Sequence, residues 1–463
     1  MLKRCTIFRA LGRGRKGAGL ALLISIVFMV FLIAAPVVFA DSNDFNSNLV
    51  NKLVNKGVIS QSDANALLAQ SNKEQASSKL PDWLKKLTLS GDFRLRYEYI
   101  DVQGQGIAPI NRARIRYRLY LTDQVVDSVK LVFGVASGGE SPVLSRSTNV
   151  TLGNSFAGKL PRIDEAYVQY TPSKIFTIAG GKFPNPIWAP SMLTWDYNIR
   201  PEGVFAMLTP PASGNLDFFL NTDFFVLDQL VNKSEFGAAM PYMGVINPGA
   251  DWKFAENGKV RLAAAYYIFD NLKRTYQFSS QLPGAYAQGG LGGSIGQIFA
   301  PTGTNNTLDS KGNLVYNYND LWVGGQADFN KLSGVLPYAG PYAEYIYNPA
   351  PSNDNQGYIM GVKLGDASTA GAGLWQIDYS YRRLERNAWL DIFPDADFFY
   401  GSTNVMGNRT SLTVGLAKNM ATAITWYNEE QIEPNSAINP TPKPVQTTAH
   451  TENTVQVDLM MSF

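Results

Sequence analysis

From residue 87 onward, hydrophobic and polar residues alternate along the chain with a period of two. Successive side chains of an extended strand point to opposite faces, so each alternating stretch predicts an amphipathic β-strand. These stretches predict sixteen strands, at 87–100, 111–122, 128–137, 161–171, 174–182, 202–210, 215–227, 242–254, 259–270, 320–331, 335–347, 357–366, 373–383, 409–418, 420–428 and 453–463. The chain is therefore expected to be all-β over residues 81–463.

The connections between the predicted strands are alternately short and long. Tight turns such as "TPS", "AENG" and "LSG" join one set of neighbours, and the other set is joined by long segments that include 138–160, 183–201, 271–319, 384–408 and 429–452. Barrels of the bacterial outer membrane have short turns at one end and long loops at the other. A soluble β-sandwich has no physical reason for short and long connections to alternate along the chain. The pattern predicts a transmembrane antiparallel β-barrel of about sixteen strands.

The alternation also indicates which face meets lipid. Apolar Trp375, Ile377, Tyr379 and Tyr381 alternate with polar Gln376, Asp378, Ser380 and Arg382. An apolar outer face, a polar inner face and aromatic residues near the strand ends are typical of a membrane barrel. After residue 40, no uncharged apolar run approaches the roughly 20 residues of a transmembrane helix, so only a closed barrel would cross the membrane.

Residues 1–40 have the features of a cleaved signal peptide. A basic start contains Lys3, Arg4, Arg9, Arg13, Arg15 and Lys16, an uncharged apolar core follows, and Val38 and Ala40 are small residues at the end. We expect cleavage after Ala40. The alternative is a retained membrane anchor, because the apolar run is just long enough to span a bilayer.

Residues 41–80 have a helical rather than a strand pattern. Apolar residues recur at helical spacing on both sides of Gly57, and Ser60 with Asp63 resembles a capping box for the second helix. We expect a small periplasmic helical hairpin followed by a polar linker. It is either a spacer or an element for docking, oligomerisation or contact with the cell wall.

Composition narrows the function. Removing residues 1–40 leaves 34 Lys and Arg against 38 Asp and Glu, so the mature chain is slightly acidic and is not expected to bind nucleic acid. The one cysteine, Cys5, is removed with the signal peptide, which excludes disulfides and thiolate metal sites from the exported protein. We expect no cofactor.

A row of arginines is the main candidate for function. "RARIRYRLYL" places Arg112, Arg114, Arg116 and Arg118 on one face of a strand, and the preceding strand places Arg94 and Arg96 on the same side. An arginine facing lipid at mid-depth costs about 2–4 kcal/mol, so the six are expected to point inward and line the pore. They either pair with carboxylates and stiffen the wall, or bias the passage of anions, and both roles are compatible.

Several motifs together resemble a known family. The helical hairpin, "GDFRLRYEY", "NRARIRYRLYL", "GKFPNPIW" and the terminal Phe463 resemble the putative porin family of Gram-negative outer membranes. The resemblance implies a location in outer-membrane lipid, an assembly signal at Phe463 for the barrel-assembly machinery, and a homotrimer.

By the same resemblance, residues 183–201 are the natural constriction loop, since the corresponding loop of general porins folds into the lumen. Its prolines at 184, 186 and 190 restrict the backbone. Trp188, Trp195 and Asp196 would then face the arginines and form an opposed-charge eyelet. The alternative is an outer loop packed over the barrel rim.

The sequence contains little evidence for an enzyme active site or for a metal site. The single histidine, His450, lies in a polar loop without a recognisable nucleophile. Asp391, Asp395 and Asp397 supply oxygen ligands but lack the spacing of a calcium loop, so no metal site is predicted. The sequence favours a passive channel for small hydrophilic solutes with an anion bias. The alternatives are a barrel-anchored tethering protein that uses residues 41–80 and a substrate-specific uptake channel.

Overall fold

The computed structural model describes residues 50, 52–54, 56, 60–66, 86–103, 108–138, 147–153, 155–227, 241–272, 305–307, 314–434 and 450–463. The chain divides into two units, Met1–Asp82 and Trp83–Phe463, which are described separately. The signal peptide predicted at 1–40 lies outside the described residues.

The larger unit contains sixteen long strands. They are β1 (Leu87–Gln103), β2 (Ile110–Val126), β3 (Val129–Ala136), β5 (Arg162–Ser173), β6 (Phe176–Lys182), β7 (Glu202–Leu208), β8 (Leu216–Val226), β9 (Tyr242–Ala255), β10 (Gly258–Asp270), β11 (Leu321–Asn330), β12 (Tyr338–Tyr347), β13 (Gln356–Gly365), β14 (Trp375–Leu384), β15 (Val405–Ala417), β16 (Met420–Gln431) and β17 (Thr451–Ser462). All sixteen predicted strands are confirmed. The alternation did not reveal the two-residue strand β4 (Val150–Thr151), which pairs with β2.

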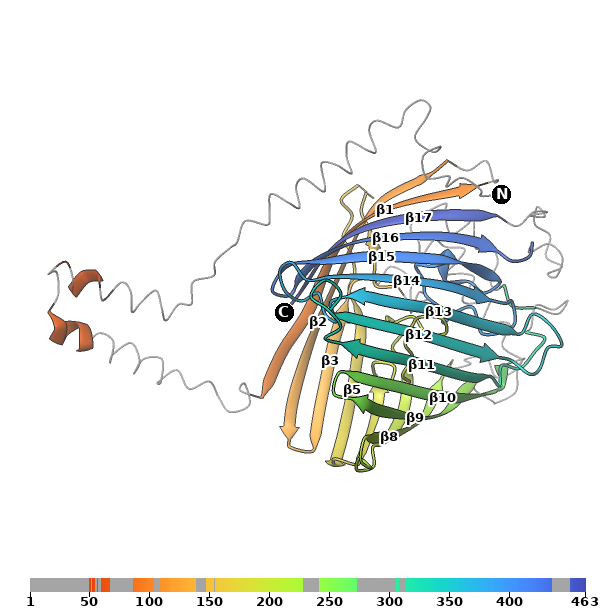
Figure 1. Ribbon diagram of the computed structural model, residues 1–463, viewed down its shortest axis with the longest axis horizontal. Helices are drawn as coiled ribbons and strands as arrows, with labels where there is room; N and C mark the ends of the chain where they lie inside the picture. Colours follow the sequence, from red (N-terminus) through yellow and green to blue (C-terminus); the bar gives the residue numbers. More distant parts are fainter. Residues whose placement is uncertain are drawn as a thin grey trace. The chain divides into compact units, whose positions relative to one another are not determined.

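The long strands form one closed antiparallel sheet. Each long strand pairs with its neighbours in the sequence, and the first strand, β1, pairs with both β2 and the last strand, β17. Figure 1 shows β10 to β17 side by side in one curved wall. Closure leaves no unpaired edge, which a sheet in lipid requires because lipid cannot hydrogen-bond to free backbone groups.

The two faces of the wall differ as the alternation predicts. Large apolar side chains such as Leu89, Phe133 and Leu262 are exposed on the outer face, with 58%, 50% and 60% of their surface accessible. Polar side chains at the alternate positions of the strands, including Arg96 and Ser380, are buried. The apolar residues of each strand therefore form the surface that lipid would cover.

Two long connections pack inside the barrel. Residues 183–201 and 385–404 carry Phe183, Ile187, Leu193, Trp195, Ala388, Trp389, Leu390 and Phe393 into one buried apolar cluster. The cluster also includes inward side chains of the wall, such as Phe225 of β8 and Tyr267 of β10. Burial of large aromatic side chains holds both segments against the wall from β7 to β14.

The smaller unit agrees with the predicted helical hairpin as far as it is described. Residues 52–54 and 61–66 are helical. The Ser60 hydroxyl and backbone N–H both donate to the Asp63 carboxylate, at 2.7 and 3.2 Å, and the Asp63 N–H donates to the Ser60 hydroxyl at 3.1 Å. This reciprocal pair is the predicted cap. Among the described residues, no helix is long and apolar enough to cross a membrane.

The terminal Phe463 lies beside the first strand. Its backbone exchanges two hydrogen bonds with Gly91, at 3.0 and 3.1 Å. A Cβ atom at position 91 would lie only 2.7 Å from the Phe463 ring and 2.4 Å from the Arg118 carbonyl oxygen. Glycine at this position allows the aromatic ring to cover the strand.

Candidate functional site

The register of β1 and β2 brings the six arginines of the wall together. Arg94 lies opposite Arg116, and Arg96 lies opposite Arg114. Acidic residues close both ends of the ladder, because Asp92 lies opposite Arg118 and Glu98 opposite Arg112. Like charges directly across a sheet are unfavourable, so the two central pairs require negative charge from elsewhere.

Most of these arginines have carboxylate partners on the wall. Asp92 accepts hydrogen bonds from Arg116 at 3.0 Å and from Arg118 at 2.6 Å. Glu98 accepts from Arg112, and Arg114 lies 3.4 Å from the same carboxylate oxygen. In β17, Asp458 accepts two hydrogen bonds from Arg96, at 2.7 and 2.8 Å.

A carboxylate from an inward loop also reaches the ladder. Asp397 accepts a hydrogen bond of 2.6 Å from Nη1 of Arg96, whose side chain is only 4% exposed. Asp397 lies in residues 385–404, a segment that the sequence pattern does not predict to fold inward. The acid facing the arginines is therefore Asp397, where the sequence suggested Asp196.

Positive charge remains in excess along the ladder. Six arginines are met by four carboxylates, those of Asp92, Glu98, Asp397 and Asp458. Buried nitrogen atoms of Arg94, Arg112 and Arg114 have no hydrogen-bond acceptor among the described residues. The arginines of this wall therefore pair with carboxylates and also leave an excess of positive charge, the two possibilities considered from the sequence.

Trp195 is the centre of the packing between the two inward segments. Its ring lies 4.6 Å from that of Phe393 and 5.8 Å from that of Trp389, measured between centroids. Its Nε1 donates to the Tyr267 hydroxyl at 3.1 Å, and Nε1 of Trp389 donates to the Thr194 carbonyl at 2.8 Å. Trp195 thus joins the two segments to each other and to the wall.

Trp188 occupies a different place. Its ring packs edge-on against Trp322 of β11, with centroids 6.4 Å apart, and the Arg261 guanidinium lies 5.5 Å from its centroid. Trp188 therefore anchors the start of residues 183–201 to the wall opposite the arginine ladder.

Asp196 is buried between the two inward segments. Its carboxylate accepts hydrogen bonds from the Ala396 N–H at 2.8 Å and from the Asn198 backbone and side chain at 2.8 and 2.7 Å. The Asp196 N–H donates to the Phe393 carbonyl at 2.8 Å. Asp196 thus fastens the two segments to each other.

The interior of the barrel is expected to respond to pH through Asp196. Burial, strengthened by the negative charge of Asp395, raises the pKa of Asp196 to about 7, despite the opposing N–H donors of Ala396 and Asn198. A raised carboxyl pKa means that the folded state holds the proton more tightly, so this contribution is complete below pH 4 and is lost as pH rises through about 7. We expect the thermal unfolding midpoint in detergent to fall between pH 5 and pH 8.5.

Asp196→Asn is the control for this pH effect, because an amide of nearly the same shape cannot titrate. The variant should show a flatter profile over the same pH range. A wild-type profile that rises with pH in this range would contradict the assignment.

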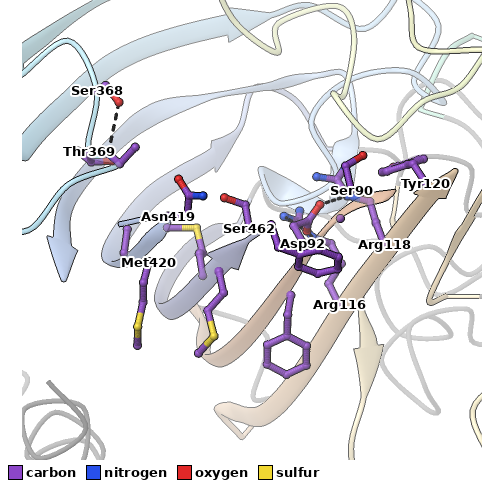
Figure 2. Close-up of a pocket in the computed structure, with 17 residues that line it drawn as sticks. Ser90, Asp92, Arg116, Arg118, Tyr120, Ser368, Thr369, Asn419, Met420 and Ser462 are labelled. Atoms are coloured by element: carbon purple, nitrogen blue, oxygen red, sulfur yellow. Dashed lines mark hydrogen bonds and ion pairs between the residues drawn. The ribbon is translucent and has the colours of Figure 1, made fainter. Parts of the chain in front are cut away.

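A cavity of about 540 Å³ opens where the arginine ladder ends, at the short-turn end of the barrel. Figure 2 shows Asp92 beside Arg116 and Arg118, with Ser368 and Thr369 of the β13–β14 turn lining another side. The two arginines share one carboxylate here, so the cavity mouth is cationic.

The remaining candidates of the sequence lie outside this site. His450 is buried, 3.3 Å from Glu452, and its ring lies 4.9 Å from that of Phe399. In the part of the chain that the structure describes, no group of three His, Cys, Asp or Glu residues has the arrangement of a metal site.

Comparison with known proteins gives two findings. A family model described as "putative porin" matches residues 107–288 and 297–463. Two variants of the porin of Rhodopseudomonas blastica are similar in structure, each with 13% identity, 81% of this chain and 100% of that chain covered, and a TM-score of 0.40. None of the curated proteins matches the chain.

Proposed function

Because the chain belongs to the putative porin family, whose model matches most of its length, we propose that it is a passive diffusion channel for small hydrophilic solutes with a preference for anions. The family and the closed barrel make it a channel protein of the bacterial outer membrane. The proposal adds the class of solute and the charge preference.

The observation that carries the proposal is the cationic surplus of the arginine ladder. Among the described residues, the six arginine charges are met by only four carboxylates, and the ladder extends along β1 and β2 to the cavity at the short-turn end. Fixed charge on the wall of an aqueous pore attracts ions of the opposite sign and repels those of its own sign.

The preference is measured as a reversal potential. In planar bilayers under a potassium chloride gradient, we expect stepwise conductance and a reversal potential biased toward chloride. Replacing Arg114, Arg116 and Arg118 together by serine should shift the reversal potential toward potassium, because the wall loses three positive charges and Asp92 loses both of its arginine partners.

Arg383→Ser is the matched control, since this arginine lies on β14 and pairs with Glu385 away from the ladder. It should leave the reversal potential near that of the wild type. An unchanged potential in the triple variant would refute the anion bias, and the absence of any conductance would refute the channel.

We also propose three interactions of the channel with partners. These are recognition of Phe463 by the barrel-assembly machinery, a homotrimer, and contact of residues 41–80 with periplasmic partners or the cell wall. The exposed Phe463 ring, with 63% of its surface accessible, is consistent with the first.

A further inference from the structure

A second, smaller cavity lies inside the barrel away from the arginine ladder. It measures about 140 Å³ and lies between residues 190–197, residues 395–398 and the inner faces of β12 to β15. Its lining combines three cations, Lys363, Arg382 and Arg409, with two carboxylates. The function proposed above makes no use of it.

Arg382 is the most unusual group in this lining. The residue is 4% exposed, and its guanidinium carbon lies 3.3 Å from the centroid of the Phe398 ring. Its Nε and Nη2 have no hydrogen-bond acceptor among the described residues, and the nearest carboxylate, that of Asp395, is 3.5 Å from Nη2. A buried cation with unsatisfied donors is costly, and an added anion would relieve that cost.

The carboxylates of the cavity are already engaged. Asp378 accepts from Arg409 at 2.7 Å and from the Tyr342 hydroxyl at 2.9 Å. Asp395 accepts from the Asp397 N–H at 3.0 Å. Asp395 also pairs with Arg382 at 3.5 Å, whereas no carboxylate among the described residues lies within ion-pair distance of Lys363. The three cations of the lining therefore exceed its two carboxylates by one positive charge, that of Lys363.

Apart from Ser191 and Ser380, the rest of the lining is apolar or aromatic, and the cavity reaches solvent. Ile359, Tyr342 and the Phe398 ring line the cavity, and the Lys363 ammonium lies 5.2 Å from the Tyr342 centroid. Tyr197 also lines it and is 59% exposed, although it belongs to an inward segment. A solute in the lumen can therefore meet the cavity at Tyr197.

We infer that this cavity binds a small monocarboxylate with a short apolar body. The carboxylate of the ligand accepts hydrogen bonds from Arg382 and lies near the ammonium of Lys363. The apolar part of the ligand lies against Phe398 and Tyr197. The volume corresponds to about four or five water molecules at roughly 30 Å³ each, which suits a molecule of the size of propionate. The inference rests on the proposed channel and adds a solute-binding step to it.

The test is the concentration dependence of propionate current through the full-length protein in planar bilayers. A binding site in the pathway gives a current that saturates, whereas free diffusion gives a current that rises linearly with concentration. We expect saturation for the wild type. Arg382→Gln should raise the half-saturation concentration by about tenfold or more, the value of one charge-assisted hydrogen bond.

One competitor and two further variants complete the test. Propionamide, a neutral molecule of the same shape, should not compete with propionate, and Lys363→Gln, at a second cation of the same cavity, should also weaken saturation. Arg383→Gln, at the neighbouring arginine of β14 that pairs with Glu385 and does not line the cavity, should keep the wild-type half-saturation concentration. Circular dichroism verifies the β-sheet of each variant.

The outcomes separate the two proposals. A linear propionate current in the wild type, or an unchanged half-saturation concentration in both the Arg382 and Lys363 variants, would overturn the binding site while leaving the channel in place. Absence of current for any ion would overturn the channel itself.

Discussion

Replacing Trp389 by alanine is expected to release both inward segments and to give a larger single-channel conductance. The Trp389 side chain is fully buried, and its ring lies 4.6 Å from Tyr267, 5.7 Å from Phe393 and 5.8 Å from Trp195, between centroids. Truncation of a buried tryptophan costs about 3–5 kcal/mol. At about 1.4 kcal/mol per factor of ten, this shifts the balance between packed and released segments by at least a hundredfold.

The released segments should also be cut by protease while the barrel stays intact, because their packing and not the strand pairing has been lost. Trp426→Ala is the matched control, since Trp426 lies on the outer face of β16 with 39% of its surface exposed. It should leave conductance and cleavage unchanged. A Trp389 variant with wild-type conductance would show that residues 385–404 do not narrow the pore.

The wall of the barrel could be predicted from the sequence because its signal is local. The period of two determines which side chains share a face, and the single connection between β1 and β2 makes their antiparallel pairing the simplest choice. The pairs Asp92–Arg118 and Glu98–Arg112 follow from that choice once the register is known.

The counter-charges from distant segments could not be predicted in the same way. Asp458 lies on the inner face of the last predicted strand, but its position opposite Arg96 depends on how the barrel closes, a property of strand tilt and stagger rather than of any one stretch. Asp397 lies in an irregular loop without periodicity, where carboxylates are usually solvated.

The packing of residues 385–404 inside the barrel could not be predicted from the sequence for a related reason. Trp389 and Phe393 stand in "NAWLDIF", which has neither strand nor helix periodicity and reads as an outer loop. The number of aromatic residues in such a loop is the only signal available, since a solvent-exposed loop has little use for them. Asp196 lies in the loop from which the resemblance predicts an eyelet acid, but its local turn with Asn198 directs the carboxylate to Ala396 instead of the arginines.

Neutralising Asp397 is expected to increase the preference for anions. Burial opposes ionisation of Asp397, but the positive charges of Arg96, Arg94 and Arg114 outweigh it and hold the pKa of Asp397 below its usual value. The group is therefore negative at neutral pH, and Asp397→Asn removes one negative charge from the lumen. One unit charge acting over about 4 Å in water is worth about 1 kcal/mol, which corresponds to roughly a fivefold change in the anion-to-cation permeability ratio.

The same substitution tests whether the Arg96–Asp397 pair holds residues 385–404 in place. Removing one partner of a buried ion pair costs about 3–5 kcal/mol, and Asp397, being partly exposed, should fall near the lower figure. In a double-mutant cycle with Arg96→Gln, the losses in unfolding midpoint should therefore be less than additive, whereas the two substitutions should shift the reversal potential in opposite directions.

Glu256→Gln provides the control for charge alone, because this carboxylate is 91% exposed in the β9–β10 turn and its ion-pair partner among the described residues is the exposed Lys331. This control substitution should change neither the unfolding midpoint nor the reversal potential. Additive losses in the cycle would mean that Asp397 is held by its own loop and not by the ladder. An unchanged reversal potential in Asp397→Asn would place the ion path away from Asp397, and the selectivity of the channel would then have to be sought at the cationic mouth formed by Arg116 and Arg118.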